Sequence, residues 1–261
     1  MSLALNDIVL IRANRRLLDG VSLKLVPGQL TVVMGENGAG KSSLLKVAAG
    51  ELTPTRGEVM LCEKSISAWT SNARAKHLAV LPQESNISFM FSAFEVVLMG
   101  RSMHCQGYPG ALDRDIANAA LVRMDVAHLA NRLYPTLSGG ERARVSLARV
   151  LAQLWQSCAQ IPRVLLLDEP VAALDIAHQH LALQVARQFA HDEGAAVVAV
   201  LHDLNLTAQY ADKVVLMKAG RVEASGSVAE TFTEVILSRC FSTPIRRIAH
   251  PDDGRPLLFA A

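Results

Sequence analysis

The sequence predicts an α/β fold with a mostly parallel central sheet, an N-terminal antiparallel β lobe and an inserted α-helical subdomain. Residues 164–167 and 195–201 are apolar runs without alternation, which is typical of parallel strands that are covered on both faces. Residues 3–34 and 57–61 instead divide into short apolar runs separated by turn residues, which favours antiparallel strands. Between residues 92 and 155 the apolar spacing becomes helical, so a helical insert interrupts the α/β order.

Length and composition set the outer limits of this prediction. The 261 residues suffice for one large domain or two small ones, and the motifs below favour a single domain over residues 1–261. We expect residues 1–85 and 160–261 to form the α/β core with the β lobe, and residues 86–159 to form the helical subdomain.

Charge, hydropathy and cysteine usage narrow the class of protein. The 26 lysines and arginines against 24 aspartates and glutamates give a net charge of +2 that is spread along the chain, so charge indicates no nucleic-acid partner. Although 51% of the residues are hydrophobic, the apolar runs are far shorter than the ~20 residues that span a bilayer, and we expect a chain that is soluble by itself. The four cysteines form no C-x-x-C pair, which favours reduced thiols in a cytoplasm.

A phosphate-binding loop lies between an expected strand at residues 30–34 and an expected helix at 42–49. It has the pattern glycine, four residues, Gly-Lys-Ser. Its glycines let successive backbone N–H groups converge on a phosphate at a helix N-terminus. Lys41 would neutralise the β and γ oxygens of a nucleotide, and the Ser42 hydroxyl would ligate Mg²⁺. The alternative is a glycine-rich turn that binds nothing. The residues of the loop are Gly35, Glu36, Asn37, Gly38, Ala39, Gly40, Lys41, Ser42 and Ser43.

A second possible phosphate site follows the helices expected at residues 92–99 and 113–124. Residues 137–141 read Leu-Ser-Gly-Gly-Glu and precede a strongly helical segment. A hydroxyl and closely approaching glycine N–H groups at a helix N-terminus can bind a phosphate. Taken alone, the same residues would be interpreted as a turn with a serine N-cap.

Two acids follow the strand at residues 164–167. Asp168 at the end of the strand would hold Mg²⁺ through water, and Glu169 would act as the general base that polarises the attacking water. A helix N-cap with a solvated neighbour is the alternative interpretation of such a pair. Further on, residues 213–224 predict a terminal hairpin, and a helix is expected near residues 228–241.

The order of these motifs resembles the ATP-binding cassette (ABC) ATPases, which have a P-loop NTPase core and a Leu-Ser-Gly-Gly-Glu signature. The resemblance spans nearly the whole chain. It implies that Gln83 senses Mg²⁺ and the γ-phosphate, that Asp175 in the D-loop crosses to the opposite subunit, and that His202 contacts the γ-phosphate and orients water. The family also places an aromatic residue on adenine, which is missing here. Arg12 at that place could stack on the base, although a solvated arginine is the alternative.

One nucleotide-binding unit without a membrane span implies the subunit of an importer. The Ala-Gln-Leu-Trp stretch at 152–155, the extra residues near 153–160 and the segments 174–180 and 202–206 are similar to the ATPases of bacterial haem importers. The ATPases of ferric-siderophore and vitamin B12 importers share the last of these segments and remain an alternative. A soluble ABC ATPase that moves no solute is an alternative of a different class, and a P-loop kinase is another.

The histidines in and near these segments do not indicate a haem-binding site in this chain. His178 and His180 lie two apart on an expected helix and point to different sides, so a solvated helix face is the preferred interpretation. Residues 103–105, Met-His-Cys, are expected in a surface loop. In an importer the cargo crosses through the permease, so the ATPase need not touch it.

The resemblance also implies a mechanism and partners. ATP would lie between the phosphate loop of one copy and the signature and D-loop of the other, namely Ser138, Gly139, Gly140, Glu141 and Asp175. The implied cofactors are ATP and Mg²⁺, the latter bound by Ser42, Gln83 and Asp168. The implied partners are a second copy, two transmembrane permease subunits and, indirectly, a periplasmic or surface solute-binding protein, with no nucleic acid. A groove near Phe89, Phe91 and Phe94 would meet the permease at the cytoplasmic face of the inner membrane, unless these rings only pack inside the insert.

Overall fold

The structure is a computed structural model that describes residues 2–83, 89–105, 107–155 and 162–261. Its centre is a sheet of strand order β10-β9-β3-β8-β7-β6 within these residues, in which only β10 runs antiparallel to its neighbour. The predicted α/β class with a mostly parallel sheet is confirmed. The strands are β3 (Gln29–Gly35), β6 (Leu78–Leu81), β7 (Val164–Asp168), β8 (Ala196–Val200), β9 (Lys213–Lys218) and β10 (Arg221–Gly226).

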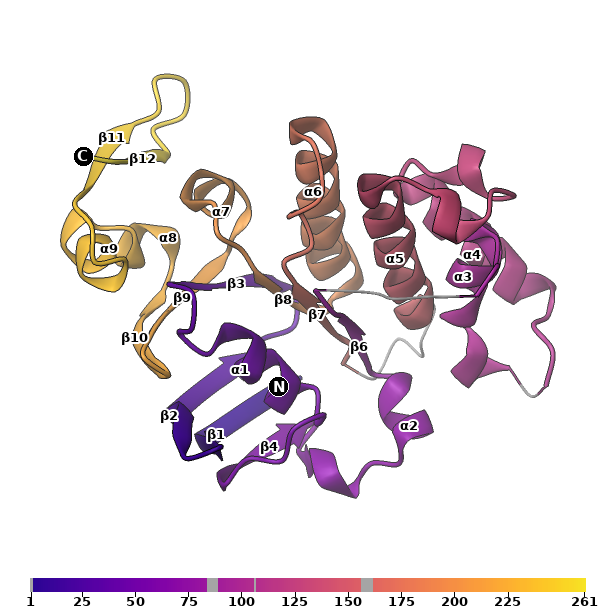
Figure 1. Cartoon of the computed structure of the whole chain (residues 1–261), viewed down its shortest axis with the longest axis horizontal. Helices are drawn as coiled ribbons and strands as arrows, with labels where there is room; N and C mark the ends of the chain where they lie inside the picture. The colour runs from indigo at the N-terminus through magenta and orange to yellow at the C-terminus, as the bar shows by residue number, and fades with distance from the viewer. Residues whose placement is uncertain (1, 84–88, 106, 156–161) are drawn as a thin grey trace.

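Both faces of this sheet are covered, which explains why its strands lack alternation. Along β3, Val32 packs into the core beneath α6 (Ile176–Glu193) and α7 (Leu204–Tyr210), whereas Val33 packs into the core shared with α1 (Lys41–Ala48) and the β lobe. Each successive side chain therefore enters a different apolar layer. Figure 1 shows α6 and α7 on one side of the sheet, and α1 with the β lobe on the other.

The β lobe is an antiparallel sheet of order β2-β1-β4-β5, as predicted for the N-terminal segment. Pairing β1 with β2 and with β4 brings the first strand to the middle of this sheet. The N-terminal hairpin turns at Ala13 and Asn14, both of which have positive φ angles. The strands are β1 (Leu3–Arg12), β2 (Arg15–Leu25), β4 (Arg56–Leu61) and β5 (Lys64–Ser65), and the short helix α2 (Ser71–Ala75) leads to β6.

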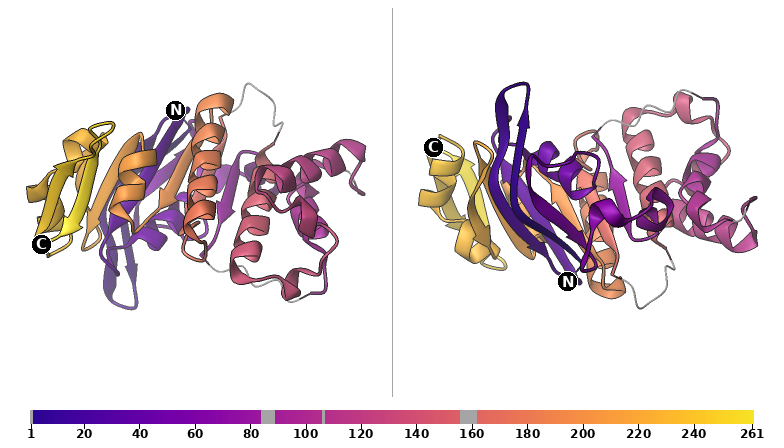
Figure 2. Two further views of the ribbon diagram at one scale, coloured as in Figure 1. Left: turned by 90° about the horizontal axis from the view of Figure 1, so that it is seen from above. Right: turned by 90° about the horizontal axis from the view of Figure 1, so that it is seen from below.

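The helical subdomain lies at one end of the molecule, and the C-terminal segment at the other (Figure 2). The helices of the helical subdomain are α3 (Ala93–Met99), α4 (Ala111–Arg123) and α5 (Gly139–Leu154), which agrees with the predicted insert. Ser92 begins α3 through a capping box with Glu95. The borders expected after residues 85 and 159 fall outside the described residues, as does most of the extra segment near 153–160.

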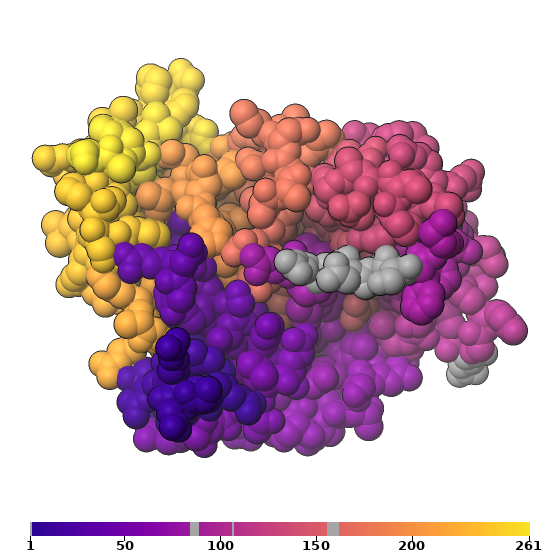
Figure 3. Space-filling model, in the orientation of Figure 1, coloured from indigo at the N-terminus to yellow at the C-terminus, as the bar shows by residue number. Residues whose placement is uncertain are grey.

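The prediction for the C-terminal segment is wrong in two respects. The single helix expected at 228–241 is two helices, α8 (Val228–Thr231) and α9 (Glu234–Cys240), because Thr233 adopts an extended conformation and caps the second one. The hairpin of β9 and β10 is not the terminal one, since β11 (Ile245–Ala249) and β12 (Pro256–Ala260) form another after α9. This second hairpin projects from the same end as α9 (Figure 3). In the parts of the chain that are described, no helix has both the length and the apolar character needed to cross a membrane.

Candidate active site

The phosphate-binding loop joins the end of β3 to the start of α1, as the motif requires. Lys41 is the first residue of α1 and is only 6% exposed. Its Nζ donates to the carbonyl oxygens of Gly35 at 2.8 Å and Glu36 at 2.9 Å, so the ammonium group lies inside the curve of the loop. Burial lowers the pKa of Lys41, while the carboxylates of Glu169 and Asp168 act in the opposite direction. This cation is therefore held where anions would compensate its desolvation.

Contacts with β9 and with the turn that follows it fix the phosphate-binding loop. A Cβ added to Gly35 would lie 2.1 Å from the carbonyl oxygen of Met217 in β9, so only glycine fits there. The turn between β9 and β10 adds a second contact, since the N–H of Gly220 donates to the carbonyl of Ala39 at 3.1 Å. This contact was not expected from the sequence. The Ala219-Gly220 pair between two strands is a turn signal, but nothing in its pattern indicates that the turn reaches the loop.

Ser42 and Asp168 face each other across the end of β7. The Ser42 Oγ donates to Asp168 Oδ1 at 3.3 Å, and both residues line a cavity of about 280 Å³ together with Lys46 and Gln83. Burial raises the pKa of Asp168, because the hydroxyl and the nearby lysines offset its desolvation only in part. A hydroxyl, a carboxylate and an amide oxygen are the hard oxygen donors that Mg²⁺ prefers. The residues expected to hold Mg²⁺ thus fit that ion in chemistry.

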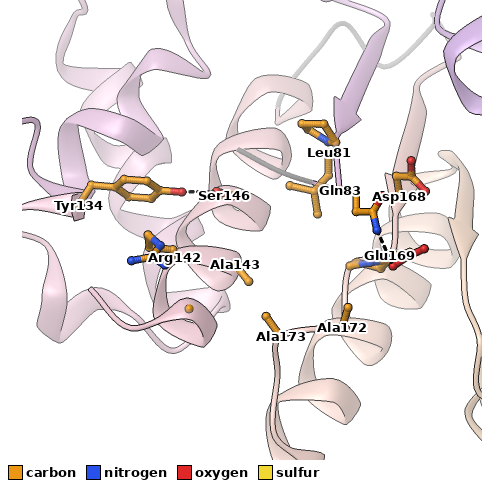
Figure 4. A pocket seen from close by; sticks show the side chains of 13 residues that line it. Leu81, Gln83, Tyr134, Arg142, Ala143, Ser146, Asp168, Glu169, Ala172 and Ala173 are labelled. Atoms are coloured by element: carbon orange, nitrogen blue, oxygen red, sulfur yellow. Dashed lines mark hydrogen bonds between the residues drawn. The ribbon is translucent and has the colours of Figure 1, made fainter. Parts of the chain in front are cut away.

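Glu169 is the meeting point of three motifs that are far apart in the sequence. Its Oε2 accepts from Gln83 Nε2 at 3.0 Å, and its Oε1 lies 2.8 Å from His202 Nε2. Gln83 follows β6, Glu169 follows β7 and His202 comes two residues after β8, so neighbouring parallel strands deliver all three at one edge of the sheet. Figure 4 shows the Gln83 amide pointing at the Glu169 carboxylate.

The backbone of Glu169 has a φ angle of +51°, a left-handed conformation that is unfavourable for a residue with a side chain. Strain of this kind costs on the order of 1–3 kcal/mol and is commonly found at functional sites. Here it turns the carboxylate from the strand direction toward Gln83 and His202. The alternative interpretation of the two acids as an N-cap and a solvated neighbour does not agree with these contacts.

The signature residues begin α5 at the border of the helical subdomain. Ser138 is the N-cap of α5, with its Oγ accepting from the Glu141 N–H at 3.3 Å and its own N–H donating to Glu141 Oε2 at 2.6 Å. Gly140 faces the carbonyl of Ala173, which a Cβ would approach to 3.2 Å. Among the residues described, no hydrogen bond or ion pair joins residues 138–141 to the loop at 35–43. The two elements that are expected to bind phosphate are therefore not joined by such contacts in one chain.

A cavity of about 250 Å³ separates the start of α5 from the two acids. It is lined by Gln83, Gly139, Arg142, Asp168 and Glu169, among others. Arg142, which the sequence analysis did not single out, lies one turn after Ser138 and donates to the Leu137 carbonyl at 2.7 Å. Its position one helical turn from the signature serine was the signal that could have identified it.

The remaining candidates lie apart from this cluster. Asp175 is the N-cap of α6 and binds the His178 N–H at 3.0 Å and its Nδ1 at 2.8 Å. Arg12 is exposed at the end of β1, in register with Arg15 of β2. His180 instead pairs with the Tyr210 hydroxyl at 2.8 Å, so His178 and His180 face different partners. Across the described ranges, no group of three or more histidine, cysteine or acidic side chains could hold a metal ion.

The surface stretch expected at residues 103–105 is only partly exposed. His104 Nε2 lies 2.9 Å from the Gln153 carbonyl, and Cys105 Sγ lies 3.4 Å from Asp113 Oδ2. Burial lowers the pKa of His104 and raises that of Cys105. Both side chains hold the helical subdomain together rather than project into solvent.

Known proteins match this arrangement over the whole chain. The family model described as "ABC transporter" matches residues 18–172. A hemin import ATP-binding protein, HmuV, of Gloeobacter violaceus is 52% identical over 246 residues, which cover 94% of this chain and 89% of that protein.

Among solved structures, a metal-chelate type ABC transporter in an inward-facing conformation has a TM-score of 0.83 and 25% identity, covering 100% of this chain and 97% of the other. The dimeric bacterial ABC transporter cassette MJ0796 has a TM-score of 0.77 and 25% identity, covering 87% and 98%. The chain therefore belongs to the ATP-binding cassette (ABC) transporter family.

Proposed function

We propose that this chain is the ATP-hydrolysing subunit of a bacterial haem importer. The observation that carries the hydrolytic part is the Glu169 carboxylate held between Gln83 and His202 at the edge of the sheet where Lys41 and Ser42 lie. The relative from Gloeobacter violaceus is named for hemin import, and its identity of 52% over nearly the whole chain supports the same cargo.

Each residue has a distinct task in the proposed reaction. Lys41 leaves its carbonyl partners and binds the β and γ oxygens of ATP, where the backbone of residues 35–43 surrounds the phosphates. Glu169 takes the proton of the attacking water as general base, and His202 contacts the γ-phosphate and orients that water. Mg²⁺ neutralises phosphate charge when it is bound, and Ser42, Gln83 and Asp168 would hold it. Arg12 would stack on the adenine from the hairpin of β1 and β2.

The site is completed by a second copy of the chain. Within the described part of the chain, no hydrogen bond or ion pair joins the loop at 35–43 to the surface formed by Ser138, Gly139, Gly140, Glu141 and Asp175. A two-fold dimer would bring this surface onto the γ-phosphate of the partner. The related cassette MJ0796 is described as dimeric, which supports this arrangement. ATP that binds only the closed dimer shifts the equilibrium toward closure, and hydrolysis releases it.

The helical subdomain offers a surface to the two permease subunits. A groove of about 300 Å³ there is lined by Phe91, Leu98, Met99 and Pro109, among others, and Phe89 nearby is 72% exposed. Phe91 and Phe94 are partly buried and also pack against the core. The alternative role of these rings, packing inside the helical subdomain, therefore applies in part to those two. Through this contact the chain would be peripheral to the cytoplasmic face of the inner membrane, and a periplasmic or surface solute-binding protein would act on it only indirectly.

Replacement of Lys41 should separate nucleotide binding from folding. Lys41→Met removes two hydrogen bonds to carbonyl groups, but it also removes the desolvation cost of a buried cation. Because these effects oppose each other, we expect the Tm of the nucleotide-free protein to change little. In the wild type, MgATP at 100 times its Kd should raise the Tm by about 5–10 °C, and this rise should be absent in Lys41→Met. Thermal denaturation with and without MgATP measures both. Lys64→Met, on the cation over the Trp69 ring in the β lobe, is the control and should keep the rise.

The cargo can be identified by reconstitution. The ATPase and its permease are placed in liposomes, and hydrolysis is measured with binding proteins loaded with haem, a ferric siderophore or vitamin B12. We expect only the haem-loaded protein to stimulate hydrolysis. Stimulation by the siderophore or B12 protein alone would assign the chain to that importer instead, and failure to co-purify with any permease would favour an ABC ATPase that moves no solute.

A further inference from the structure

The helix α7 fixes the backbone on which His202 stands. Asp203 is its N-cap, and Asp203 Oδ1 accepts from the Leu206 N–H at 2.8 Å. The Thr207 hydroxyl, on a fully buried residue, donates to the Asp203 carbonyl at 2.8 Å. His202 directly precedes this cap. On the other side of His202, the Leu201 N–H donates to the Val33 carbonyl of β3 at 3.3 Å. A rotation of α7 would therefore act on one of the two anchors of the imidazole, whose Nε2 lies 2.8 Å from Glu169 Oε1.

Asn205, the second residue of α7, binds the C-terminal hairpin through both ends of its amide. Its Nδ2 donates to the Leu258 carbonyl at 3.1 Å, and its Oδ1 accepts from the Leu258 N–H at 2.9 Å. In an antiparallel pair the N–H and C=O of one residue point to the same side. The groups of Leu258 that meet Asn205 thus lie on the free edge of β12, and the amide continues the ladder in place of a further strand.

Both sides of this contact are anchored. The Leu258 side chain is 5% exposed and packs into the core between the central sheet and the helices α6 and α7. At the other end of α7, the Tyr210 hydroxyl lies 2.8 Å from Nδ1 of His180 in α6. The helix is therefore held at its last residue by α6 and next to its first residue by the hairpin. Of these two anchors, the contact of Asn205 is the one nearer to His202 in the chain.

We propose that Asn205 is a positioning residue for ATP hydrolysis, which joins the C-terminal hairpin to α7 and thereby keeps the His202 imidazole within hydrogen-bond distance of Glu169. The inference rests on the proposed role of His202. It gives a task to the hairpin of β11 and β12 and to the asparagine of the 202–206 segment, neither of which the hydrolytic cluster uses.

The direct test replaces the amide by a group of similar size that forms no hydrogen bond. Asn205→Leu is prepared in the full chain, together with its permease, and kcat and KM for ATP are measured. We expect kcat to fall about tenfold, as a displaced catalytic group would cause, with KM for ATP changed less than twofold. Asn205→Asp keeps an acceptor for the Leu258 N–H but loses the donor, so its kcat should lie between those of Asn205→Leu and the wild type. Should Asn205→Leu fail to fold, Asn205→Asp supports the same comparison.

Ser227→Ala is the matched control for stability. It removes the N-cap of α8, a contact elsewhere in the C-terminal segment, and should lower the Tm without changing kcat. If Asn205→Leu behaves like this control, with a lower Tm and a wild-type kcat, the positioning role is refuted.

A double variant shows whether Asn205 acts through His202. In a His202→Ala background, Asn205→Leu should cause no further loss of kcat, because the group it positions is gone. The same tenfold loss in both backgrounds would overturn the inference while leaving the role of His202 intact. Full activity of His202→Ala alone would overturn that role as well. No cargo is needed, so the result is independent of whether the importer carries haem.

Discussion

Glu169→Gln should bind ATP and form a stable dimer that does not turn over. The amide has nearly the shape of the carboxylate and can still bond to Gln83 and His202, but it cannot accept the proton of the attacking water. Loss of a general base typically costs 10²–10⁴-fold, so we expect kcat to fall about 10³-fold with ATP affinity retained. Phosphate release measures the first quantity. Size-exclusion chromatography with light scattering, with and without MgATP, measures the dimer.

The dimer of Glu169→Gln also tests where the second phosphate-binding surface comes from. If the variant stays monomeric at saturating ATP, the residues at 138–141 do not complete the site of a partner. Glu230→Gln is the control, since this acid lies in the capping box of α8, and it should hydrolyse ATP as the wild type does. A loss of activity in both variants would indicate a general effect of removing a carboxylate.

Gly35→Ala should destabilise the whole domain as well as abolish hydrolysis. The new Cβ would lie 2.1 Å from the Met217 carbonyl oxygen, a backbone atom of β9 that pairs in register with Gly35 itself. Neither strand can move without disturbing the central sheet. Overpacking of this kind costs about 1–3 kcal/mol or more, and the φ angle of +151° adds strain. We expect the Tm to fall by roughly 6–12 °C.

Gly38→Ala is the matched variant for this stability measurement. Gly38 lies in the same loop with a φ angle of +81°, but a Cβ there would meet no atom within 4 Å. Only the conformational cost of about 1 kcal/mol remains, which corresponds to a fall of about 2–4 °C in Tm. Equal decreases for the two variants would show that the contact with Met217 is not what fixes Gly35.

The parts of the fold that could be predicted from sequence are those with strong local signals. The strands β7 and β8 were identifiable because residues 164–167 of the first and 196–200 of the second are all apolar, as strands buried on both faces require. The loop at 35–43 was identifiable because its glycines, lysine and serine have few other uses in that order. Those signals do not specify strand order, so the position of β3 between β8 and β9 could not be derived.

The C-terminal hairpin shows how such a signal is obscured. Asp253-Gly254 is a turn pair, but the flanking strands carry consecutive arginines at 246 and 247 and do not alternate regularly. The break between α8 and α9 was missed for a related reason, because the residues on both sides favour helix and only the Thr233 cap separates them.

The candidate site was predicted as a set of residues but not as a geometry. The strand with two acids predicted Glu169, and the resemblance to the ABC ATPases implied Gln83 and His202. The left-handed backbone at Glu169 instead depends on the surrounding tertiary structure. The same is true of Lys41, whose two carbonyl partners follow from the curvature of the loop. The contact between Asn205 and Leu258 spans 53 residues and has no local signal at all.

The arrangement of the strands separates two kinds of evolutionary change. Gln83, Glu169 and His202 follow adjacent strands of one buried sheet, where most substitutions would disturb the chemistry and the core together. The groove on α3 lies in the helical subdomain, at the opposite end of the molecule from the C-terminal hairpin. Substitutions in this groove, which we propose as the permease contact, would therefore leave Gln83, Glu169 and His202 in place, so that docking specificity and hydrolysis would be free to evolve separately.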